Sequence, residues 1–545
     1  MAGEDSGGAA ARQALASPSA AMISSAPVST VQHETRGCVA AGHPVTAAAA
    51  AEILRAGGNA FDAALAAVAA ACVAEPVLCS TGGGGFLLAR PVDAPPRIYD
   101  FFVHTPRRRR PADEVEAAPV ITDWGTTSQE FQIGLGTAAT PGLVRGLFAV
   151  HHDLGRTPLP QILAPAVAAA HQGVEVTPFQ AYLMTLVAPI YLADPASRAL
   201  FGAPSGEPLR QGERLRNPEL GAMLEAIGRE GERLFYEGEV AAAIVAQCRE
   251  RGGHITAADL HAYRVERRAP LTLRYRDATL LTNPPPSAGG ILIAFGLGLL
   301  ARLELGDLAF GSPEHLGLLS AVLARTVDVR ALHGASEALL ADDLLARHAA
   351  ELATARAAYR GTTHISVIDA AGNAASVTLS NGEGNGSLVP GTGMMLNNML
   401  GEDDVNPAGP HGWPEDQRLS SMMAPSAIIR DDGWFAVTGS GGSKRIRSAI
   451  LQVVSNLVDF AMSPADAVTA PRMHVEPGLV NLEGGLASSA AGLERLGQLF
   501  PRVIAWDQRN MFFGGCHSVA RAQGGALTGV GDPRRDGVVL GDSHG

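Results

Sequence analysis

Apolar positions near the beginning of the chain recur with a helical period. The segments Val45 to Leu54 and Ala60 to Val73 both place apolar residues at three- and four-residue spacing. Between them, Gly57-Gly58-Asn59 supplies a stop for the first segment and a turn. The pattern predicts two helices packed against each other.

The stretch from Ala60 to Val77 is the most apolar of the chain. Asp62 and Glu75 interrupt it, and half of its residues are alanine, which gains little from transfer into lipid. We interpret it as a buried helix rather than a membrane span and expect no membrane partner.

A run of four glycines follows Thr81 and leads into a short apolar strand, Phe86 to Ala89. Consecutive glycines indicate that the backbone turns sharply or that another group approaches it closely. A phosphate-binding loop is the weaker interpretation, because no Gly-Lys-Ser or Gly-Lys-Thr follows and no helix begins there.

The pattern changes near residue 361. Residues from about Leu159 to Leu352 are mostly helical in pattern, with the main break at Pro284 to Gly290. After Gly361 the chain alternates as strands with glycine-rich turns. A helix-rich beginning and a strand-rich end favour sheets covered by helices.

The first strands after this change predict a β-hairpin. Thr363 to Ile368 and Ala374 to Ser380 alternate as strands, and Gly372 can take a positive φ in the turn between them. Pairing across this turn places Thr362 opposite Ser380, give or take one residue, with Cβ atoms about 4.5 to 5.5 Å apart. Two facing hydroxyls are usually a plain sheet pair, so the pattern alone favours a structural role.

Composition and charge restrict the class of protein. Hydrophobic residues make up 46% of the chain and charged residues 18%, a balance typical of soluble globular proteins. A net charge of −12 argues against a nucleic-acid partner, because such binding depends on neutralising phosphates with Lys and Arg. We interpret the dense basic run Arg107 to Arg110 in the first place as a solvated loop before Pro111. The second interpretation is an anchor for an anionic group.

Cysteine usage and the first residues bear on location. The cysteines are odd in number, scattered and never in a C-x-x-C pair, so neither a disulfide framework nor a zinc site is indicated; they are Cys38, Cys72, Cys79, Cys248 and Cys516. Residues 1–36 are rich in Ala, Ser and Gly and carry acids where a signal peptide would carry positive charge. They predict a disordered leader and a cytoplasmic protein.

Motifs spread in order over nearly the whole chain after this leader are together highly specific. They resemble those of the γ-glutamyltransferases (γ-glutamyl transpeptidases), which are N-terminal nucleophile hydrolases. The motifs are Gly57-Gly58-Asn59, Gly82 to Phe86, Thr140-Pro141-Gly142, Pro284 to Gly290, Thr362-Thr363-His364, Leu396-Asn397-Asn398, Leu419-Ser420-Ser421-Met422, Gly439 to Ser443 and Gly531-Asp532-Pro533-Arg534.

The resemblance implies an α+β fold, a four-layer αββα sandwich built from two subunits that one precursor forms by cutting itself. The bond that is cut would be Gly361–Thr362, which leaves a large, helix-rich subunit, 37–361, after the leader, and a small, strand-rich catalytic subunit, 362–545. Cleavage would give Thr362 a free α-amine with a pKa near 8, which can take the proton of the same residue's hydroxyl. One residue would then be both nucleophile and base.

The resemblance also implies the other catalytic residues. Gly441 and Gly442 match the family's oxyanion-hole glycines, where a backbone N–H can approach the developing charge without a Cβ in the way. Ser380 takes the place of a family threonine that hydrogen-bonds the nucleophile and assists self-cleavage. No metal and no organic cofactor is implied.

Residues that would hold the α-carboxylate and α-amine of a γ-glutamyl donor are partly retained. Ser420 and Ser421 match the carboxylate-binding serines. Glu402 falls at the acid that would meet the α-ammonium, with Asp403 as an alternative if the loop shifts. For both acids, an exposed loop charge is the competing interpretation.

Three departures concern the donor. Phe102 stands where the family has the arginine that forms the principal salt bridge to the donor carboxylate, so either Arg107 to Arg110 supplies that charge or the donor differs. Met399 stands where Glu or Gln is usual, and Gly382, or Asn381 after a one-residue shift, where the family has asparagine. Losing a charged hydrogen bond costs roughly 1.5 to 3 kcal/mol, enough to change substrate preference.

The segment from Asp404 to Arg418 is short and lacks the stretch that forms a lid in some relatives. An uncovered site admits water and bulky donors, so hydrolysis gains over transfer to an amino acid.

Together these residues predict a self-processing γ-glutamyl hydrolase or transferase acting on glutathione-like compounds, with water or an amino acid as acceptor. One alternative is an acylase of the same fold that acts on a glutaryl or cephalosporin-type amide. Another is a non-catalytic scaffold. Because relatives are often exported, a periplasmic location is the alternative to the cytoplasmic one.

Overall fold

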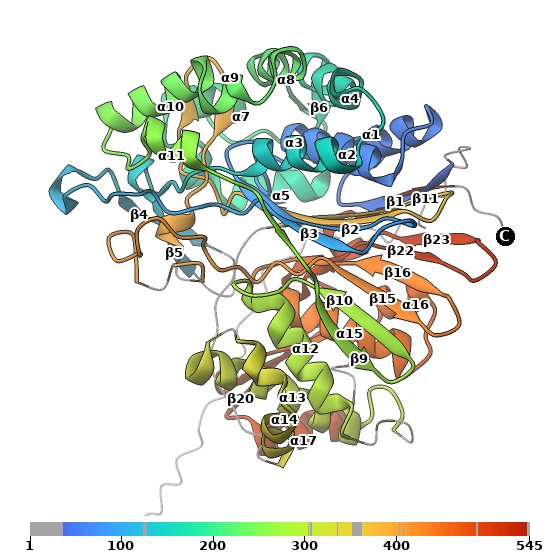
Figure 1. Ribbon diagram of the computed structural model, residues 1–545. Helices are drawn as coiled ribbons and strands as arrows, with labels where there is room; N and C mark the ends of the chain where they lie inside the picture. Colours follow the sequence, from blue (N-terminus) through green and yellow to red (C-terminus); the bar gives the residue numbers. More distant parts are fainter. Residues whose placement is uncertain are drawn as a thin grey trace, which may run out of the picture.

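Two antiparallel sheets lie face to face in the middle of the molecule, and helices cover the outer face of each (Figure 1). The computed structural model describes residues 36–123, 128–303, 305, 308–334, 336–350, 362–402, 404–406, 408–486 and 489–541. The arrangement is the predicted α+β fold in four layers, αββα.

The first sheet has seven strands, and its centre is the predicted hairpin. In spatial order the strands are β24 (Val538–Gly541), β1 (Gly37–Ala41), β11 (Thr363–Asp369), β12 (Ala374–Ser380), β2 (Gly84–Arg90), β3 (Arg97–Asp100) and β8 (Glu266–Arg268). Strands from before and after residue 361 are neighbours within this sheet, so neither part of the chain builds it alone.

The second sheet has six strands and also combines both parts of the chain. In spatial order they are β23 (Leu527–Val530), β22 (Ser518–Arg521), β16 (Phe435–Thr438), β15 (Ser426–Arg430), β10 (Ala278–Thr282) and β9 (Leu271–Tyr275).

Small residues allow one helix to lie fully buried on the first sheet. Helix α2 (Ala60–Ala74) is buried along its whole length between β11, β12 and the outer helix α4 (Leu159–Gln172). An alanine-rich surface can approach neighbours on all sides, which explains its lack of an exposed polar face. The same layer contains α1 (Pro44–Arg55), α3 (Leu143–Leu154) and α8 (Pro218–Glu230).

Helices on the other side pack on the second sheet and on one another (Figure 1). They are α12 (Ala288–Leu300), α13 (Pro313–His333), α14 (Asp342–Ala350), α15 (Arg445–Val458), α16 (Pro464–Thr469) and α17 (Ala490–Leu499). The other α-helices of the described chain are α5 (Pro178–Leu186), α6 (Ala188–Tyr191), α7 (Pro195–Phe201), α9 (Arg233–Tyr236), α10 (Glu239–Glu250) and α11 (Ala257–Ala262). The other β-strands are β4 (Ala118–Asp123), β5 (Ser128–Ile133), β6 (Val174–Glu175), β7 (Arg214–Leu215), β13 (Leu388–Val389), β14 (Met394–Met395), β17 (Ser440–Gly441), β18 (Met473–Glu476), β19 (Leu479–Leu482), β20 (Arg502–Ala505) and β21 (Gly515–Cys516).

The two faces of the first sheet belong to different cores. In β2, Phe86 and Leu88 face the second sheet and share a core with its strands, whereas Leu87 and Ala89 face the helix layer that contains α2. This alternation is the two-residue period of a strand buried on both faces.

Hydroxyl groups also tie the two sheets together. Ser366 of β11 donates to the carbonyl oxygens of Val437 and His517, and Ser376 of β12 donates to that of Thr438. Because each donor satisfies a buried carbonyl, these bonds fix the hairpin relative to the second sheet.

The predicted early elements are confirmed. Helices α1 and α2 and strand β2 lie where the pattern placed them. The glycine run is explained by close approach, because a methyl group on any of the four would lie within 2.7 Å of a neighbouring carbonyl oxygen; the glycines are Gly82, Gly83, Gly84 and Gly85.

Several strands escaped prediction, among them the pairs β4–β5, β6–β7 and β9–β10. Strands β9 and β10 lie inside the stretch expected to be mostly helical, and they form one edge of the second sheet. Their tight connection contains Arg276 at φ +54° rather than a glycine or asparagine, so the usual hairpin signal is missing from the sequence.

Two earlier predictions concern the membrane and the leader. None of the helices in the described ranges has the length and apolar character needed to span a membrane. The predicted leader lies outside the described residues except for Arg36, and so does Gly361 on the predicted cleavage bond.

Candidate active site

Thr362 lies directly before β11 and is 4% exposed. In the hairpin, Thr363 pairs with Leu379 and His364 with Thr378, which confirms the predicted register. The same register continued by one residue places Thr362 opposite Ser380, at the end of β12. The two hydroxyl residues therefore lie at the open end of the central hairpin.

The neighbouring Thr363 is bound to a buried acid. Its hydroxyl donates to Oε2 of Glu75 over 2.7 Å, and the hydroxyl of Thr46 donates to Oε1 over 2.6 Å. Glu75 caps the C-terminus of α2 and is fully buried. Burial raises the pKa of the Glu75 carboxyl, whereas the two hydroxyl donors act in the opposite direction.

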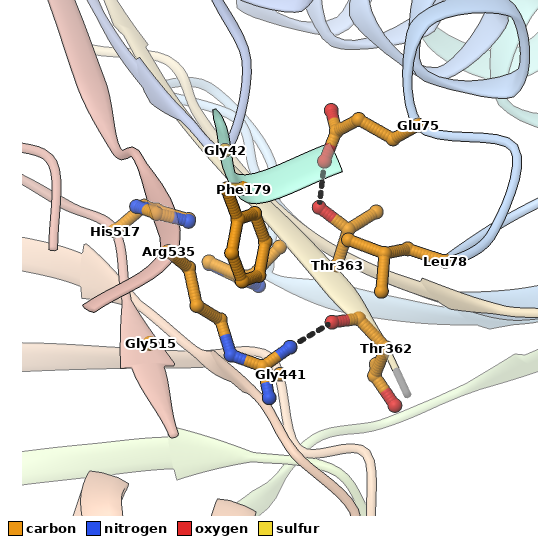
Figure 2. A pocket seen from close by; sticks show the side chains of 11 residues that line it. Gly42, Glu75, Leu78, Phe179, Thr362, Thr363, Gly441, Gly515, His517 and Arg535 are labelled. Carbon is orange, nitrogen blue, oxygen red and sulfur yellow. Dashed lines mark hydrogen bonds between the residues drawn. The ribbon is translucent and has the colours of Figure 1, made fainter. Parts of the chain in front are cut away.

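A buried cation lies on the other side of Thr362. Nη1 of Arg535 donates to the carbonyl oxygen of Thr362 over 3.1 Å, and Figure 2 shows that the Thr362 hydroxyl points away from this bond. Burial lowers the pKa of the Arg535 guanidinium to about 10, so the side chain stays charged at neutral pH.

The predicted oxyanion glycines lie beside these groups. Gly441 ends β17, and a methyl group on it would lie 2.0 Å from the carbonyl oxygen of Thr362. Gly442 has φ +116°, and its Cα lies beside the Arg535 guanidinium. Side chains are thus excluded at both positions, at Gly441 by contact and at Gly442 by backbone conformation.

Two histidines near Thr362 are neutral. Both ring nitrogens of His364 are hydrogen-bonded, Nδ1 to Thr378 and Nε2 to Ser366, and burial lowers its pKa well below the usual value. Burial likewise lowers the pKa of His517 to about 4. Together with Glu75 and Arg535, these rings line a narrow pocket behind the Thr362 carbonyl (Figure 2).

The acid predicted for the donor ammonium is connected to Ser380. Glu402 is 3% exposed, so it is not an exposed loop charge, and its carboxylate lies against Gly382. The N–H of Gly382 donates to the hydroxyl of Ser380 over 3.0 Å. Asp403, the alternative acid, lies outside the described residues.

Asn381 occupies a different environment. It is fully buried, its side chain lies beside the hydroxyl of Tyr191, and its carbonyl accepts from the N–H of Asn398. Within the described residues, neither Asn381 nor Glu402 lines the pocket behind Thr362.

Phe102 is part of the core between the sheets. Its ring is fully buried and stacks on Phe86, with ring centroids 5.5 Å apart. The guanidinium of Arg418 donates to the carbonyl oxygen of Phe102, and the hydroxyl of Tyr263 donates to the same oxygen over 2.6 Å. An arginine therefore contacts the main chain at this position although the side chain here is an apolar ring.

The arginine run 107–110 lies away from the pocket behind Thr362. Arg107 and Arg109 are exposed and lie 3.6 Å from Asp416 and 3.7 Å from Glu415, respectively. The N–H of Arg110 donates to His254. The run thus packs on the loop around residue 415, and none of its members lines the pocket behind Thr362 in the described structure.

The serine pair lies on a loop next to the Phe102 segment. The N–H of Leu419 donates to the carbonyl of Val103 over 3.3 Å. The carbonyl of Ser421 accepts from the hydroxyl of Ser287 over 2.8 Å, and its own hydroxyl accepts from the N–H of Met423. Ser420 is half-buried. The motif that begins at Pro284 therefore holds the serine loop in place.

A further ion pair joins two loops of the site. Nζ of Lys444, two residues after Gly442, lies 3.0 Å from Oδ1 of Asp404, and the Ser443 hydroxyl donates to Oδ2 of the same residue. The loop that carries Glu402 is thereby tied to the loop that carries Gly441 and Gly442.

Sequence reasoning missed Glu75, His517 and Arg535. A single acid at the end of an otherwise apolar helix, and a second arginine directly after Gly531-Asp532-Pro533-Arg534, were the available signals. In the described part of the chain, no group of three His, Cys, Asp or Glu side chains could hold a metal ion.

Known proteins resemble this chain over nearly its full length. A family model described as Gamma-glutamyltranspeptidase matches residues 46–542. The Acylase ACY 1 proenzyme of Pseudomonas sp. (strain V22) is 33% identical over 94% of both chains. The Glutathione hydrolase proenzyme of Escherichia coli (strain K12) is 30% identical over 96% of this chain and 95% of its own.

Solved structures share the fold. The cephalosporin acylase from Bacillus halodurans has a TM-score of 0.82 at 24% identity, over 96% of this chain and 99% of its own. The γ-glutamyltranspeptidase of Helicobacter pylori has a TM-score of 0.51 at 23% identity, over 60% of this chain and 93% of its own.

Proposed function

Because this chain belongs to the gamma-glutamyltranspeptidase family, we propose that it is a self-processing N-terminal threonine hydrolase that cleaves the γ-glutamyl amide of glutathione-like compounds. Its nucleophile would be Thr362. The relatives named as proenzymes support a precursor that is processed into two subunits.

The observation that carries the proposal is the position of Thr362. It lies at the end of the central hairpin, opposite Ser380 and in contact with Gly441. Once the Gly361–Thr362 bond is cut, the α-amine accepts the hydroxyl proton while Oγ attacks the amide carbon. The N–H groups of Gly441 and Gly442 then stabilise the oxyanion.

The remaining steps follow from the same groups. The protonated amine gives its proton to the departing nitrogen as the C–N bond breaks, which leaves an ester on Thr362. Water, or the amine of an acceptor, attacks this ester, and the hydroxyl of Thr362 is restored. Glu402, which is buried and adjacent to Gly382, supports an α-ammonium on the donor.

A second candidate keeps the nucleophile and changes the donor to a glutaryl-type amide, which lacks the α-amine. Its support is the apolar character of Phe102 and Met399, both of which belong to the core between the sheets. Neither side chain can bond a charged α-amino acid group.

The first experiment measures the intact mass of the purified protein together with Thr362→Ala and Thr362→Ser. We expect two fragments in the wild type, the smaller beginning at Thr362, and none in Thr362→Ala. Thr362→Ser keeps a hydroxyl and serves as the matched control, so it should still be cut. A wild type that stays uncut and inactive for days contradicts the proposal.

The second experiment compares γ-glutamyl p-nitroanilide with glutaryl p-nitroanilide on the cleaved wild type. A higher kcat/KM for the γ-glutamyl compound supports the first donor. A preference of tenfold or more for the glutaryl compound supports the second.

A further inference from the structure

Arg535 is a buried cation whose charge the mechanism above does not use. It is 3% exposed and ends the short η6 turn (Pro533–Arg535). Nη1 donates to the Thr362 carbonyl, and Nε has no hydrogen-bond partner within the described structure. Glycines make room for it, since a methyl group on Gly515 would lie 2.4 Å from its Cδ.

The turn that carries Arg535 is anchored by its neighbours. Asp532 pairs with Arg472 over 2.7 Å and with Arg534 over 3.1 Å, and Arg534 also pairs with Glu483. These four groups are almost fully buried, so the network fixes the turn. Both oxygens of Asp532 are taken by other groups, and among the described residues Arg535 forms no ion pair within 4.0 Å.

We propose that Arg535 is a positioning residue for the nucleophile, which holds the carbonyl of Thr362 and, by its positive charge, keeps the freed α-amine of Thr362 neutral. This inference rests on the proposed function. A neutral amine is the form that can take the hydroxyl proton, so the charge of Arg535 would act on the first step of the reaction.

Distance makes this effect substantial. The α-nitrogen of Thr362 is three bonds from the oxygen that Arg535 contacts, which places the two charges about 6 Å apart. At an effective dielectric constant of about 20, a cation at this distance lowers the pKa of an ammonium group by up to about two units.

Other groups around the nucleophile modify the effect. Glu75 faces it from α2 and favours the ammonium form where its carboxyl, whose pKa burial raises, is ionised, whereas His364 and His517 are neutral at pH 7. Behind Arg535 lie Arg445, Arg472 and Asp532, whose charges act on the guanidinium. Among the described residues that line this pocket, Arg535 is therefore the cation that contacts Thr362 directly, and Glu75 is the acid that opposes it when ionised.

The pKa of the amine sets the fraction of enzyme that is competent at a given pH. An amine with an ordinary pKa near 8 is about one-tenth neutral at pH 7, and an amine with a pKa of 7 is about one-half neutral. A shift of one unit would therefore increase the competent enzyme about fivefold at neutral pH.

The test is the dependence of kcat/KM on pH, whose acidic midpoint reports the amine of the free enzyme. The substrate is whichever of the γ-glutamyl and glutaryl p-nitroanilides the wild type turns over. We expect a wild-type midpoint near 7, a midpoint about one unit higher in Arg535→Gln, and a midpoint near that of the wild type in Arg535→Lys, which keeps the charge.

Arg447→Gln is the matched control. Arg447 is equally buried, donates to the carbonyl of Val475, and has a pKa lowered by burial to the same value of about 10. Its substitution should change stability but not the midpoint.

Two results would overturn the inference while leaving the proposed function intact. One is a cleaved, active wild type whose kcat/KM has an acidic midpoint at pH 8 or higher. This result contradicts the inference even if Arg535→Gln does not fold. The other is a cleaved Arg535→Gln enzyme with an unchanged midpoint. An uncut wild type would instead remove the proposed function and this inference with it.

Discussion

The carboxylate of Glu402 packs directly against the Cα of Gly382. A methyl group on Gly382 would lie 2.0 Å from Oε1 of Glu402 and 2.1 Å from Oδ1 of Asn398. The asparagine expected here from the family resemblance would not fit beside this carboxylate. Gly382 is thus a departure that Glu402 requires, and its N–H donates to the hydroxyl of Ser380, the residue opposite Thr362.

Gly382→Ala should therefore damage donor recognition. The added methyl group displaces the Glu402 carboxylate, and we expect kcat/KM for γ-glutamyl p-nitroanilide to fall about tenfold or more, mainly through KM. Gly391→Ala is the matched control, because Gly391 has a similar φ of +72° and open space around it, compared with +68° at Gly382. Equal effects of the two substitutions would show that backbone strain, not Glu402, is responsible.

Phe102→Arg should not restore a donor-carboxylate site. The ring is fully buried against Phe86, and Arg418 already donates to the main chain at this position. A second guanidinium here would be an unpaired buried charge, so we expect the free energy of unfolding to fall by about 3 kcal/mol or more in urea titrations.

Phe102→Leu, which keeps an apolar side chain, should cost about half as much. A stable Phe102→Arg variant with increased γ-glutamyl turnover would contradict this interpretation and place the side chain in the donor pocket.

The parts of the site that could be predicted are those set by local sequence. Strand alternation and a glycine turn fix the hairpin register, so the sequence alone predicts that Thr362 lies opposite Ser380, and the observed register agrees. The glycine run Gly82 to Gly85 likewise predicts the close backbone contacts that the structure has.

The other parts depend on long-range packing. Arg535 is 173 positions from Thr362, and Glu75 is 288 positions from Thr363, so no periodicity connects them. The substitution at Phe102 was visible in the sequence, but its burial was not, nor was the contact with Arg418. Burial decides what such a residue does, and burial is a property of the assembled layers.

Buried neutral histidines should make the fold sensitive to acid. Burial lowers the pKa of several histidines to about 4, compared with 6.5 in the unfolded chain; they are His43, His254, His315, His474 and His517. Below pH 6.5 the unfolded chain binds protons that the folded chain does not, so stability falls as pH decreases from 6.5 to 4.

Each fully buried histidine contributes up to about 1.4 kcal/mol per pH unit in this window. Urea titrations at pH 7.5, 6.5, 5.5 and 4.5 measure the slope. His152→Gln removes a histidine whose side chain is 86% exposed and should leave the slope unchanged. Constant stability between pH 6.5 and 4.5 would mean that the buried rings are not neutral in the folded protein.

Glu75→Gln should change the pH profile in the direction opposite to Arg535→Gln. Burial raises the pKa of the Glu75 carboxyl, and the hydroxyls of Thr46 and Thr363, which donate hydrogen bonds to its two oxygens, oppose this shift. At a pH where Glu75 is ionised, removing its negative charge disfavours the ammonium form of Thr362, so we expect the acidic midpoint of kcat/KM to fall, and the double variant with Arg535→Gln to return toward the wild type. Thr46→Val breaks one of the hydrogen bonds without removing a charge, so it should lower kcat but leave the midpoint near that of the wild type. A midpoint that rises in Glu75→Gln would show that the two charges do not act on the same amine.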